Sequence, residues 1–479
     1  MNAFLTQRAL ADTRRHFLSQ CGMGLAGMFL GGLQGAGAEN PLKPKKPSLE
    51  AKAKSVIYLH MAGSPSQLEL FDFKPELLKY SGQPCPDELL RGKRFAFIKG
   101  VPKMLGTPYK FAQHGQSGAS ISELLPHFSK VVDDVTIVRS MNTDQFNHAP
   151  AQLFVHTGSP RFGAASMGAW ATYGLGSENQ DLPGFVVLTS GGNNPDGGKS
   201  LWGSGFLPSV YQGVQCRTSG DPVLYLSNPE GMTRSLRRKT LDALHDLNGL
   251  QQKESGDPET EARIAQYELA YRMQISVPQV MDISKETEAT RALYGAQPGE
   301  TSFANNCLLA RRLVESGVRF VQLFHWGWDH HGNSRREDIR YALQPQAASV
   351  DRSMSALITD LKQRGLLDQT LIVWGGEFGR TPMQENRAGS GPYMGRDHHP
   401  YAYTMWMAGG GMKKGLNFGS TDEIGYYIAE NPVSVRDLQA TILHQLGLDP
   451  HRFSYPYLGL NQRLIGPTDE GRVRKELLA

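Results

Sequence analysis

Cysteine is scarce in this chain, with four residues in 479. Cys85, Cys216 and Cys307, the three outside the N-terminal segment, lack the spacing of a metal site and imply no disulfide framework. An excess of one charge is also lacking, since 50 basic and 46 acidic residues leave a formal net charge of +4. No basic cluster carries the interleaved aromatics of a nucleic-acid surface, so we expect no nucleic-acid partner.

Long apolar runs are missing as well. The run over residues 22–33 has about a dozen residues, whereas a bilayer-spanning helix needs about 20. It follows Thr13-Arg14-Arg15-His16-Phe17-Leu18, a twin-arginine pattern, and precedes the small residues Ala36-Gly37-Ala38. We interpret residues 1–38 as a cleaved export signal that gives a periplasmic or otherwise exported protein with no transmembrane segment. The alternative is a frayed amphipathic tail.

Apolar, β-favouring runs alternate with helical patterns along the rest of the chain. Strands are predicted at residues 55–61, 135–138, 184–188, 318–323 and 370–374, and helices over much of 233–316 and at 347–364. This alternation predicts an α/β fold with a mainly parallel sheet sandwiched between helices. We expect a flexible lead-in over 39–54, a single domain over 55–467 and a C-terminal tail over 468–479.

Polar clusters follow two of the predicted strands, where open α/β sheets bind ligands. In the stretch WGWDHHGN at 326–333, an extended backbone would point successive side chains in opposite directions. Asp329 and His331 would then lie on one side and His330 on the other. After the strand at 370–374, Glu377 adds a carboxylate. Arg380 adds a planar guanidinium group, which suits an oxyanion. The alternative interpretations are a hydrogen-bonded loop for Asp-His-His and a helix cap for Glu377.

A third cluster repeats the acidic residue followed by two imidazoles, at Asp397, His398 and His399. Asp, Glu and His ligands without cysteine suit a divalent cation, and zinc, manganese, calcium and magnesium all remain open. We therefore predict a cation or oxyanion site formed by segments that are far apart in the sequence.

The sequence resembles a bacterial family catalogued as a domain of unknown function, number 1501, in the alkaline phosphatase and sulfatase superfamily. The likeness runs from about Ser55 to Pro467. It is carried by the residues Ala62-Gly63-Ser64-Pro65-Ser66-Gln67-Leu68, Phe71-Asp72, Asn147-His148, His156-Thr157-Gly158, Gly327-Trp328-Asp329-His330-His331, Gly376-Glu377-Phe378-Gly379-Arg380-Thr381-Pro382, Gly395-Arg396-Asp397-His398 and Asp437-Leu438-Gln439-Ala440-Thr441-Ile442-Leu443.

The resemblance implies an alkaline-phosphatase/sulfatase-like sheet and hydrolysis of sulfate or phosphate esters with one or two divalent cations. The superfamily's sulfatases place a modified cysteine at the start of a helix, and alignment from Thr157-Gly158 puts His148 there. The first predicted strand ends in His60-Met61-Ala62-Gly63 and lacks the superfamily's metal-binding aspartate. Glu377-Phe378-Gly379 stands where relatives carry Asp-His-Gly. We expect one cation in place of a complete two-metal site.

These inferences lead to one set of expected roles. The metal ligands are expected at Asp329, His331, Glu377, Asp397 and His398, the catalytic groups at His148 and Arg380, and substrate contacts at Asn147, Ser64 and Asn333. His148 would act as a nucleophile or general base, or as a further ligand or a hydrogen-bonded loop residue.

Three functions remain open. The first is an exported metal-dependent hydrolase of small-molecule or glycan sulfate or phosphate esters. The second is a non-catalytic module that binds an anionic glycan or a partner protein in the envelope. The third is a structural part of an envelope assembly. Because function depends on the site and not on the fold, the superfamily does not choose among them.

Overall fold

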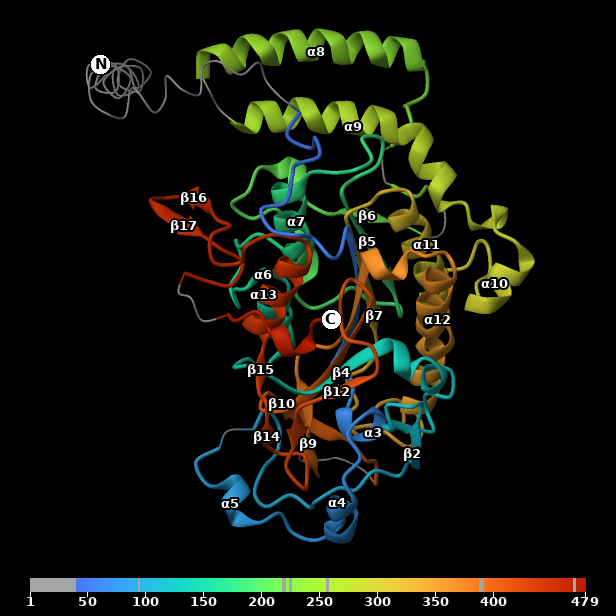
Figure 1. Ribbon diagram of the computed structural model, residues 1–479, viewed down its shortest axis with the longest axis vertical. Coiled ribbons are helices and arrows are strands. Elements are labelled where there is room, and N and C mark those ends of the chain that lie inside the picture. Colours follow the sequence, from blue (N-terminus) through green and yellow to red (C-terminus); the bar gives the residue numbers. More distant parts are fainter. Residues whose placement is uncertain are drawn as a thin grey trace. The chain divides into compact units, whose positions relative to one another are not determined.

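The computed structural model describes residues 40–93, 95–217, 221–223, 226–255, 258–386, 392–467 and 471–479. Their centre is a nine-stranded sheet in the order β12-β4-β11-β8-β1-β7-β5-β6, with β15 paired to β4 (Figure 1). The strands are β1 (Ser55–Ala62), β4 (Val135–Asn142), β5 (Phe185–Ser190), β6 (Val214–Cys216), β7 (Phe320–Trp326), β8 (Thr370–Gly375), β11 (Tyr403–Ala408), β12 (Leu416–Phe418) and β15 (Val433–Ser434). All five predicted strands are present.

The sheet is mainly parallel. Strand β1 pairs in parallel with β7 and β8, and β5 pairs in parallel with β6 and β7, whereas β11 runs antiparallel between β4 and β8. Every residue of β1, SVIYLHMA, is buried. A strand that is covered on both faces must be apolar throughout, which is why the sequence shows a continuous run here. The expected mixed, mainly parallel sheet between helices is confirmed.

Helices cover the two faces. Helices α11 (Phe303–Glu315) and α12 (Leu343–Gln363) lie on one side of the sheet, and α6 (His148–Thr157), α7 (Met167–Leu175) and α13 (Val435–Gln445) lie on the other (Figure 1). Local caps set their starts: the Ser302 side chain accepts from Asn305 N, and Ser434 and Asp437 form a capping box. Such caps bond backbone N–H groups that have no partner within the helix.

Helices occupy much of the region over 233–316, as predicted. It forms α8 (Arg234–Ser255), α9 (Pro258–Met281), η5 (Ile283–Lys285), α10 (Glu288–Tyr294) and α11. Helix α8 packs along α9, and its outward face is exposed. Among the helices of the described residues, none has the length and hydrophobicity to traverse a bilayer.

Smaller elements complete the structure. The helices are α3 (Gln67–Leu70), α4 (Pro75–Tyr80), α5 (Asp87–Leu90) and the short turns η1 (Phe128–Lys130), η2 (Val132–Asp134), η3 (Gly198–Trp202), η4 (Ser209–Tyr211), η6 (Leu367–Gln369) and η7 (Lys475–Leu477). The strand pairs are β2 (Phe111–His114) with β3 (Ala119–Ser122), β9 (Gly379–Gln384) with β10 (Arg396–His399), β13 (Ser420–Thr421) with β14 (Ile428–Glu430), and β16 (Tyr455–Tyr457) with β17 (Leu460–Gln462).

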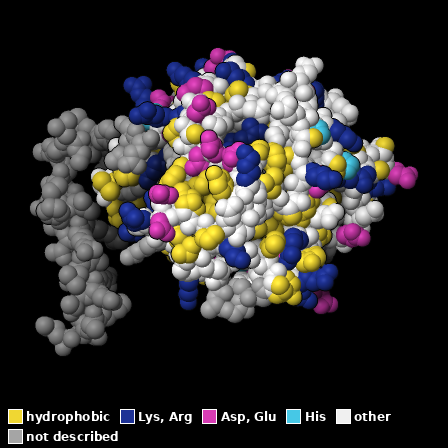
Figure 2. Space-filling model, turned by 90° about the horizontal axis from the view of Figure 1, so that it is seen from below, with side chains coloured by type: hydrophobic (Ala, Val, Ile, Leu, Met, Phe, Trp, Pro, Cys, Tyr) yellow, Lys and Arg dark blue, Asp and Glu magenta, His cyan; other side chains and the backbone are white. Residues whose placement is uncertain are grey.

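A second, smaller hydrophobic cluster lies near α4 and α5. Its buried members include Leu68, Leu77, Met104 and Met383, so it joins α3 and α4 to strand β9. Figure 2 views the molecule from below, and hydrophobic side chains gather near the middle of this face with lysine and arginine side chains around them. The buried cluster of Leu68, Leu77, Met104 and Met383 supports the β9–β10 pair, which carries part of the candidate site.

The segments that flank the predicted domain contact it. Lys52 N and Ala53 N donate to Gln445 O at 2.9 and 2.8 Å, and Leu49 N donates to Gly447 O at 2.8 Å, so the expected lead-in is bonded to the domain there. In the expected tail, Leu477 is fully buried. The predicted export signal over 1–38 lies outside the described residues.

Candidate metal centre

The candidate site lies where three central strands end. Strands β8, β1 and β7 are neighbours, with His60 opposite Gly375 and Ala62 opposite Trp326. Their carboxyl ends therefore meet at one edge of the sheet, where the loops after β1, β7 and β8 come together. Helix α6 follows β4 and also begins in this region, with His148 as its first residue.

Two glycines let the loops approach closely. A Cβ on Gly63, whose φ is +103°, would lie 2.7 Å from the main-chain nitrogen of Asp329. A Cβ on Gly395 would lie 2.0 Å from the carbonyl carbon of His331. Both contacts are with backbone, so any larger residue would push the segments apart. The first glycine places the β1 loop against Asp329, and the second places the start of β10 against His331.

Arg380 on strand β9 positions the Asp329 carboxylate. Its guanidinium is buried, and Nη2 donates to Asp329 Oδ1 at 2.5 Å. Its other contacts are main-chain carbonyls: Nε donates to Ser64 O at 3.0 Å, Nη1 to Arg396 O at 3.1 Å and Nη2 also to Gly63 O. All three guanidinium nitrogens thus bond protein acceptors. The residue expected to contact a substrate oxyanion instead fixes Asp329.

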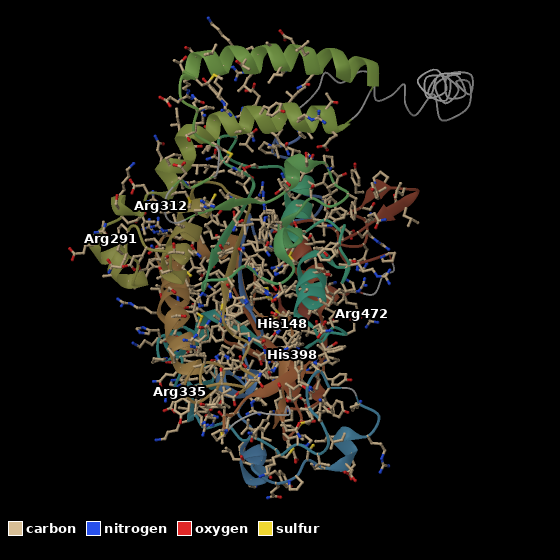
Figure 3. All side chains as sticks on the ribbon, turned by 180° about the vertical axis from the view of Figure 1, so that it is seen from behind. His148, Arg291, Arg312, Arg335, His398 and Arg472 are labelled. Carbon is tan, nitrogen blue, oxygen red and sulfur yellow. The ribbon has the colours of Figure 1, made fainter. Side chains whose placement is uncertain are left out.

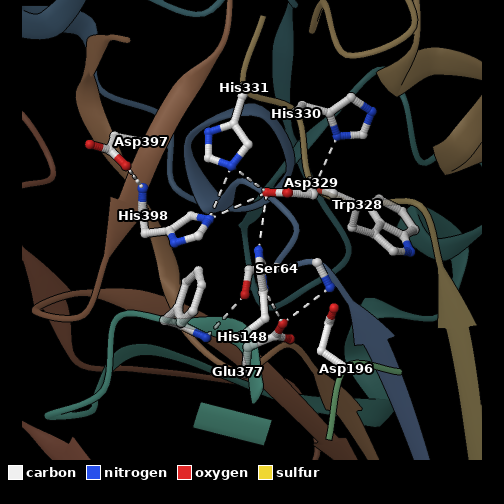
Figure 4. A network of polar contacts seen from close by, with 12 residues as sticks. Ser64, His148, Asp196, Trp328, Asp329, His330, His331, Glu377, Asp397 and His398 are labelled. Atoms are coloured by element: carbon white, nitrogen blue, oxygen red, sulfur yellow. Dashed lines mark hydrogen bonds and ion pairs between the residues drawn. The ribbon is translucent and has the colours of Figure 1, made fainter. Parts of the chain in front are cut away.

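Three imidazoles surround that carboxylate (Figure 4). The Nε2 atoms of His331, His148 and His398 lie 2.8, 3.3 and 3.4 Å from Asp329 Oδ1. The Nε2 atoms of His331 and His398 are 3.1 Å apart. All four donor atoms lie within 4.8 Å of one another, a spacing that could hold a metal ion. Segments after β4, after β7 and on β10 therefore meet at one point.

The partners of the three Nδ1 atoms determine whether each Nε2 presents a lone pair or a proton to the centre. His148 Nδ1 contacts Glu377 Oε1 at 2.6 Å, His398 Nδ1 contacts Phe146 O at 2.7 Å, and His331 Nδ1 contacts Glu385 Oε2. Ionised carboxylates and carbonyls only accept hydrogen bonds, so each Nδ1 carries a proton. In the neutral imidazole, Nε2 then presents a lone pair. Histidines that bind metals are oriented by outer partners of this kind.

The electrostatics also favour a cation at the centre. Burial alone would raise the pKa of Asp329, but Arg380 and the three imidazoles hold it well below its usual range. Burial opposes protonation of His148, yet its bonds to Asp329 and Glu377 outweigh burial and raise its pKa to about 9. For His398, burial together with the charge of Arg380 lowers the pKa to about 3. Without a cation, the excess negative charge retains a proton on His148.

Donor spacing provides a separate check on a metal. Tetrahedral zinc with bonds of 2.0–2.1 Å has ligand atoms about 3.3 Å apart. The distances of 2.8 to 3.4 Å to Asp329 Oδ1, and of 3.1 Å between two imidazole nitrogens, are close to that spacing. Three imidazoles and one carboxylate suit zinc and related transition metals better than calcium or magnesium, which prefer oxygen ligands. The residues therefore fit a metal cation.

Two expected ligands lie outside this group of four. Glu377 is fully buried behind His148, where Oε1 also accepts from Gln152 Nε2 at 3.0 Å and from Gly63 N at 3.1 Å. Asp397 Oδ2 accepts from Phe97 N at 2.7 Å and Ile98 N at 2.9 Å. Asp397 instead belongs to a second buried group, with His331 and Glu385, whose ligand atoms also lie within 4.8 Å of one another and could hold a metal ion. Glu377 thus orients a ligand, and Asp397 holds a neighbouring loop.

The expected substrate contacts lie in three different environments. Asn147 precedes α6 and is exposed beside His148, with no cap bond from its side chain. Ser64 has a φ of +61° and is fully buried, and its Oγ accepts from Phe378 N at 3.2 Å. Asn333 donates to Glu337 Oε2 at 2.9 Å. Of the three, Asn147 alone is both exposed and next to the four-residue group.

Sequence reasoning missed Glu385 as a partner of His331. Glu385 is the one acidic residue between Phe378 and Arg396, in the segment that joins the strand pair β9–β10. A single acidic residue in the segment that leads to a histidine-bearing cluster is the sequence signal that could have identified it. Arg396 anchors the same pair through a fully buried ion pair with Glu69, at 2.6 Å between Nη2 and Oε1.

The sequence profile of one family, described as "Protein of unknown function (DUF1501)", matches residues 53–478. The chain belongs to this family. That membership confirms the resemblance carried by the sequence motifs. A search of curated proteins gave no match.

Several solved structures are similar to the chain at low scores. PsFucS1 sulfatase from Pseudoalteromonas sp. shares 12% identity over 89% of this chain and 73% of its own, with a TM-score of 0.36. Phosphonate monoester hydrolase SpPMH from Silicibacter pomeroyi shares 12% identity over 89% and 76%, with a TM-score of 0.35. A protein in the alkaline phosphatase superfamily from Vibrio parahaemolyticus shares 11% identity over 92% and 74%, with a TM-score of 0.37. At these scores the likeness adds nothing to the sheet topology described above.

Proposed function

We propose that His148, Asp329, His331 and His398 bind one divalent transition-metal cation, zinc or one with similar preferences. We further propose that the protein hydrolyses sulfate or phosphate esters there, on small molecules or glycans. The observation that carries the proposal is the direction of the three imidazoles. Each has its Nδ1 bonded to an acceptor, and each Nε2 lies within 3.4 Å of one carboxylate oxygen. The proposal keeps the export outside the cytoplasm that the twin-arginine pattern predicts.

The protein groups have separate tasks in this proposal. A bound divalent cation would polarise an ester oxygen and lower the pKa of a coordinated water. Arg380 holds Asp329 in place, while Glu377 fixes the tautomer and direction of His148. The Asp329 side chain is 31% exposed and that of His148 16% exposed, so solvent and substrate reach the group from this side. Asn147, exposed beside His148, is placed to contact an incoming ester.

Elemental analysis of the purified protein tests the metal. We expect about one equivalent per chain in the wild type, loss of the metal in His398→Gln, and retention in His399→Gln. His399 is the matched control because its Nε2 bonds Tyr426 O at 2.6 Å, away from the group of four. A wild-type protein that stays metal-free after reconstitution with zinc, manganese and cobalt would refute the proposal.

Turnover is tested on chromogenic aryl sulfates, aryl phosphates and phosphonate monoesters. We expect hydrolysis by the metal-loaded wild type and by His399→Gln, and none above background by Asp329→Ala. Equal rates for the wild type and Asp329→Ala would place the activity elsewhere or in a contaminant.

One observation favours a second candidate, a non-catalytic module that binds an anionic glycan or a partner protein. Four protein donors would fill a tetrahedral metal site, and closed sites of that kind are structural. Cobalt substitution distinguishes the two candidates. Weak visible absorption that changes when phosphate is added would show an open position and favour hydrolysis. Intense four-coordinate absorption that is unaffected by phosphate would favour the binding module.

A further inference from the structure

A cavity of about 630 Å³ lies next to the loop that carries Asp329, but its wall is formed by other residues. Gly327 and His330 line it on one side, Arg335 and Arg336 come from the following turn, and Gln346 comes from the first turn of α12. Neither Asp329 nor His331 lines this cavity. In Figure 4 the ring of His330 points away from the Asp329 carboxylate, so the cavity and the four-residue group occupy different sides of the loop.

Two arginines give the cavity a positive charge that no described residue neutralises. Arg335 and Arg336 are exposed, and neither forms a hydrogen bond or ion pair with a described residue. The Arg335 guanidinium lies over the Tyr341 ring, 4.6 Å from its centroid. The carboxylates of residues 333–342 are already bonded, Glu337 by Asn333 and Asp338 by Arg340. Arginine forks of this kind suit the oxygens of sulfate or phosphate.

The turn that presents these arginines is firmly held. Asp338 is fully buried and accepts from Met394 N at 3.0 Å and Arg340 N at 2.8 Å. Ile339 N donates to Met394 O at 2.9 Å, and Ile339 O accepts from the Tyr109 hydroxyl at 2.5 Å. A ligand would therefore meet an ordered surface, and binding would cost little conformational entropy in the loop.

The start of α12 adds a second source of positive potential. This helix of 21 residues has no side-chain cap at Ala342 and no acidic residue in its first turn. The positive end of its dipole therefore favours an anion here. Among the helix residues that line the cavity, Ala342 N and Gln346 N already donate to Asp338 O and Ala342 O, and Pro345 has no N–H. His330 is 5% exposed, and its Nδ1 contacts Trp328 O at 3.0 Å. Because that Nδ1 carries the ring proton, Nε2 offers a lone pair, and it has no partner among the described residues. His330, which lines the cavity, therefore presents an acceptor for a hydroxyl group of the ligand, and the anionic oxygens are left to the two arginines.

We propose that the cavity between the 333–342 turn and the first turn of α12 binds the tetrahedral oxyanion of a sulfate or phosphate group. Arg335 and Arg336 are its charged ligands, and the start of α12 supplies further positive potential. This site does not depend on the metal centre. Figure 3 shows Arg335 apart from His148 and His398, which lie together. A free ion and a group carried by an acidic glycan share this chemistry.

Calorimetric titration of the chelator-treated protein at constant ionic strength tests the site. The probes are inorganic sulfate, inorganic phosphate, a sulfated tetrasaccharide and its desulfated form. We expect Arg335→Ala and Arg336→Ala each to weaken oxyanion binding by about tenfold or more, since each removes a charge-assisted contact. Arg472→Ala is the matched control, because Arg472 is exposed, its side chain forms no bond with a described residue, and it lies elsewhere on the surface (Figure 3).

Both arms of the titration are decisive. Tighter binding of the sulfated tetrasaccharide than of the inorganic ions assigns the site to a glycan-borne group, and equal binding assigns it to the free oxyanion. The proposal is overturned if neither class binds, or if Arg472→Ala weakens binding as much as Arg335→Ala and Arg336→Ala. Because the protein is free of metal, a failed metal centre would not change these outcomes. Thermal unfolding of each variant confirms that these exposed substitutions leave the fold intact.

Discussion

The sequence Asp-His-His occurs twice, and the structure uses the two copies differently. In the loop after β7, Asp329 and His331 join the candidate metal centre while His330 between them turns away. On strand β10 the middle residue, His398, joins the centre while Asp397 bonds a loop and His399 bonds Tyr426 O. Backbone alternation sends every second side chain to the opposite face, so the starting register decides which histidine becomes a ligand.

The largest expected effect separates the two aspartates. Asp329→Asn removes the carboxylate on which the three imidazoles converge, so we expect loss of the stoichiometric metal in elemental analysis. It also leaves Arg380, which is 1% exposed, without its ionic partner, and we expect about 3 kcal/mol lower free energy of unfolding. In Asp397→Asn the amide oxygen still accepts from the loop, so metal content should be retained. Equal loss of metal from Asp329→Asn and Asp397→Asn would contradict the assignment of Asp329 as a metal ligand.

A smaller effect separates the first pair of histidines. We expect His331→Gln to weaken zinc affinity by more than about 100-fold, because even outer partners of metal ligands are worth 10- to 100-fold. We expect His330→Gln to leave zinc affinity within about threefold, since it faces the other side of the loop. Competition with a chromogenic chelator measures both variants. A reversed order would mean that the register of residues 329–331 is shifted by one residue.

A still smaller effect tests the residue behind the centre. Glu377→Gln replaces the charged acceptor that orients His148 with a weaker, neutral amide oxygen but leaves the four donors in place, so zinc affinity should fall by about tenfold. Gln152→Leu is the control, because it removes a bond to Glu377 without touching a donor atom. If Glu377→Gln instead abolishes binding, Glu377 is a direct ligand, as the sequence suggested.

The smallest effect concerns a buried histidine outside both copies. His325 contacts Ser190 Oγ and Ser349 Oγ, both at 3.0 Å, and burial lowers its pKa to about 4. The unfolded chain binds a proton near pH 6.5 and the folded one near pH 4, so stability is lost as pH falls through this window. Between pH 7 and 5.5 the free energy of unfolding should drop by about 1 kcal/mol more than in His325→Gln. Urea unfolding of the metal-free proteins measures this difference, and parallel pH profiles would contradict it.

Much of the architecture could be predicted from the order of residues along the chain. Continuous apolar runs such as residues 55–61 can exist only inside a sheet covered on both faces, so they identified the central strands. The alternation of strands and helices along the chain then predicted that the polar loops would gather where the strands end. Three of the expected ligands, Asp329, His331 and His398, meet there, as the position of their segments after strands and in glycine-rich loops suggested.

The composition of the metal centre depends on contacts that form only in the folded chain. Glu377 follows β8 as closely as Asp329 follows β7, yet the loop after β8 passes behind His148 and turns its carboxylate away from the group of four. Arg380 looked like a substrate contact, but Asp329 and three carbonyls from other segments take up all its nitrogens. Local pattern specifies which side chains are available near a strand end. Which of them share a point in space depends on contacts between distant segments, and no local pattern encodes those.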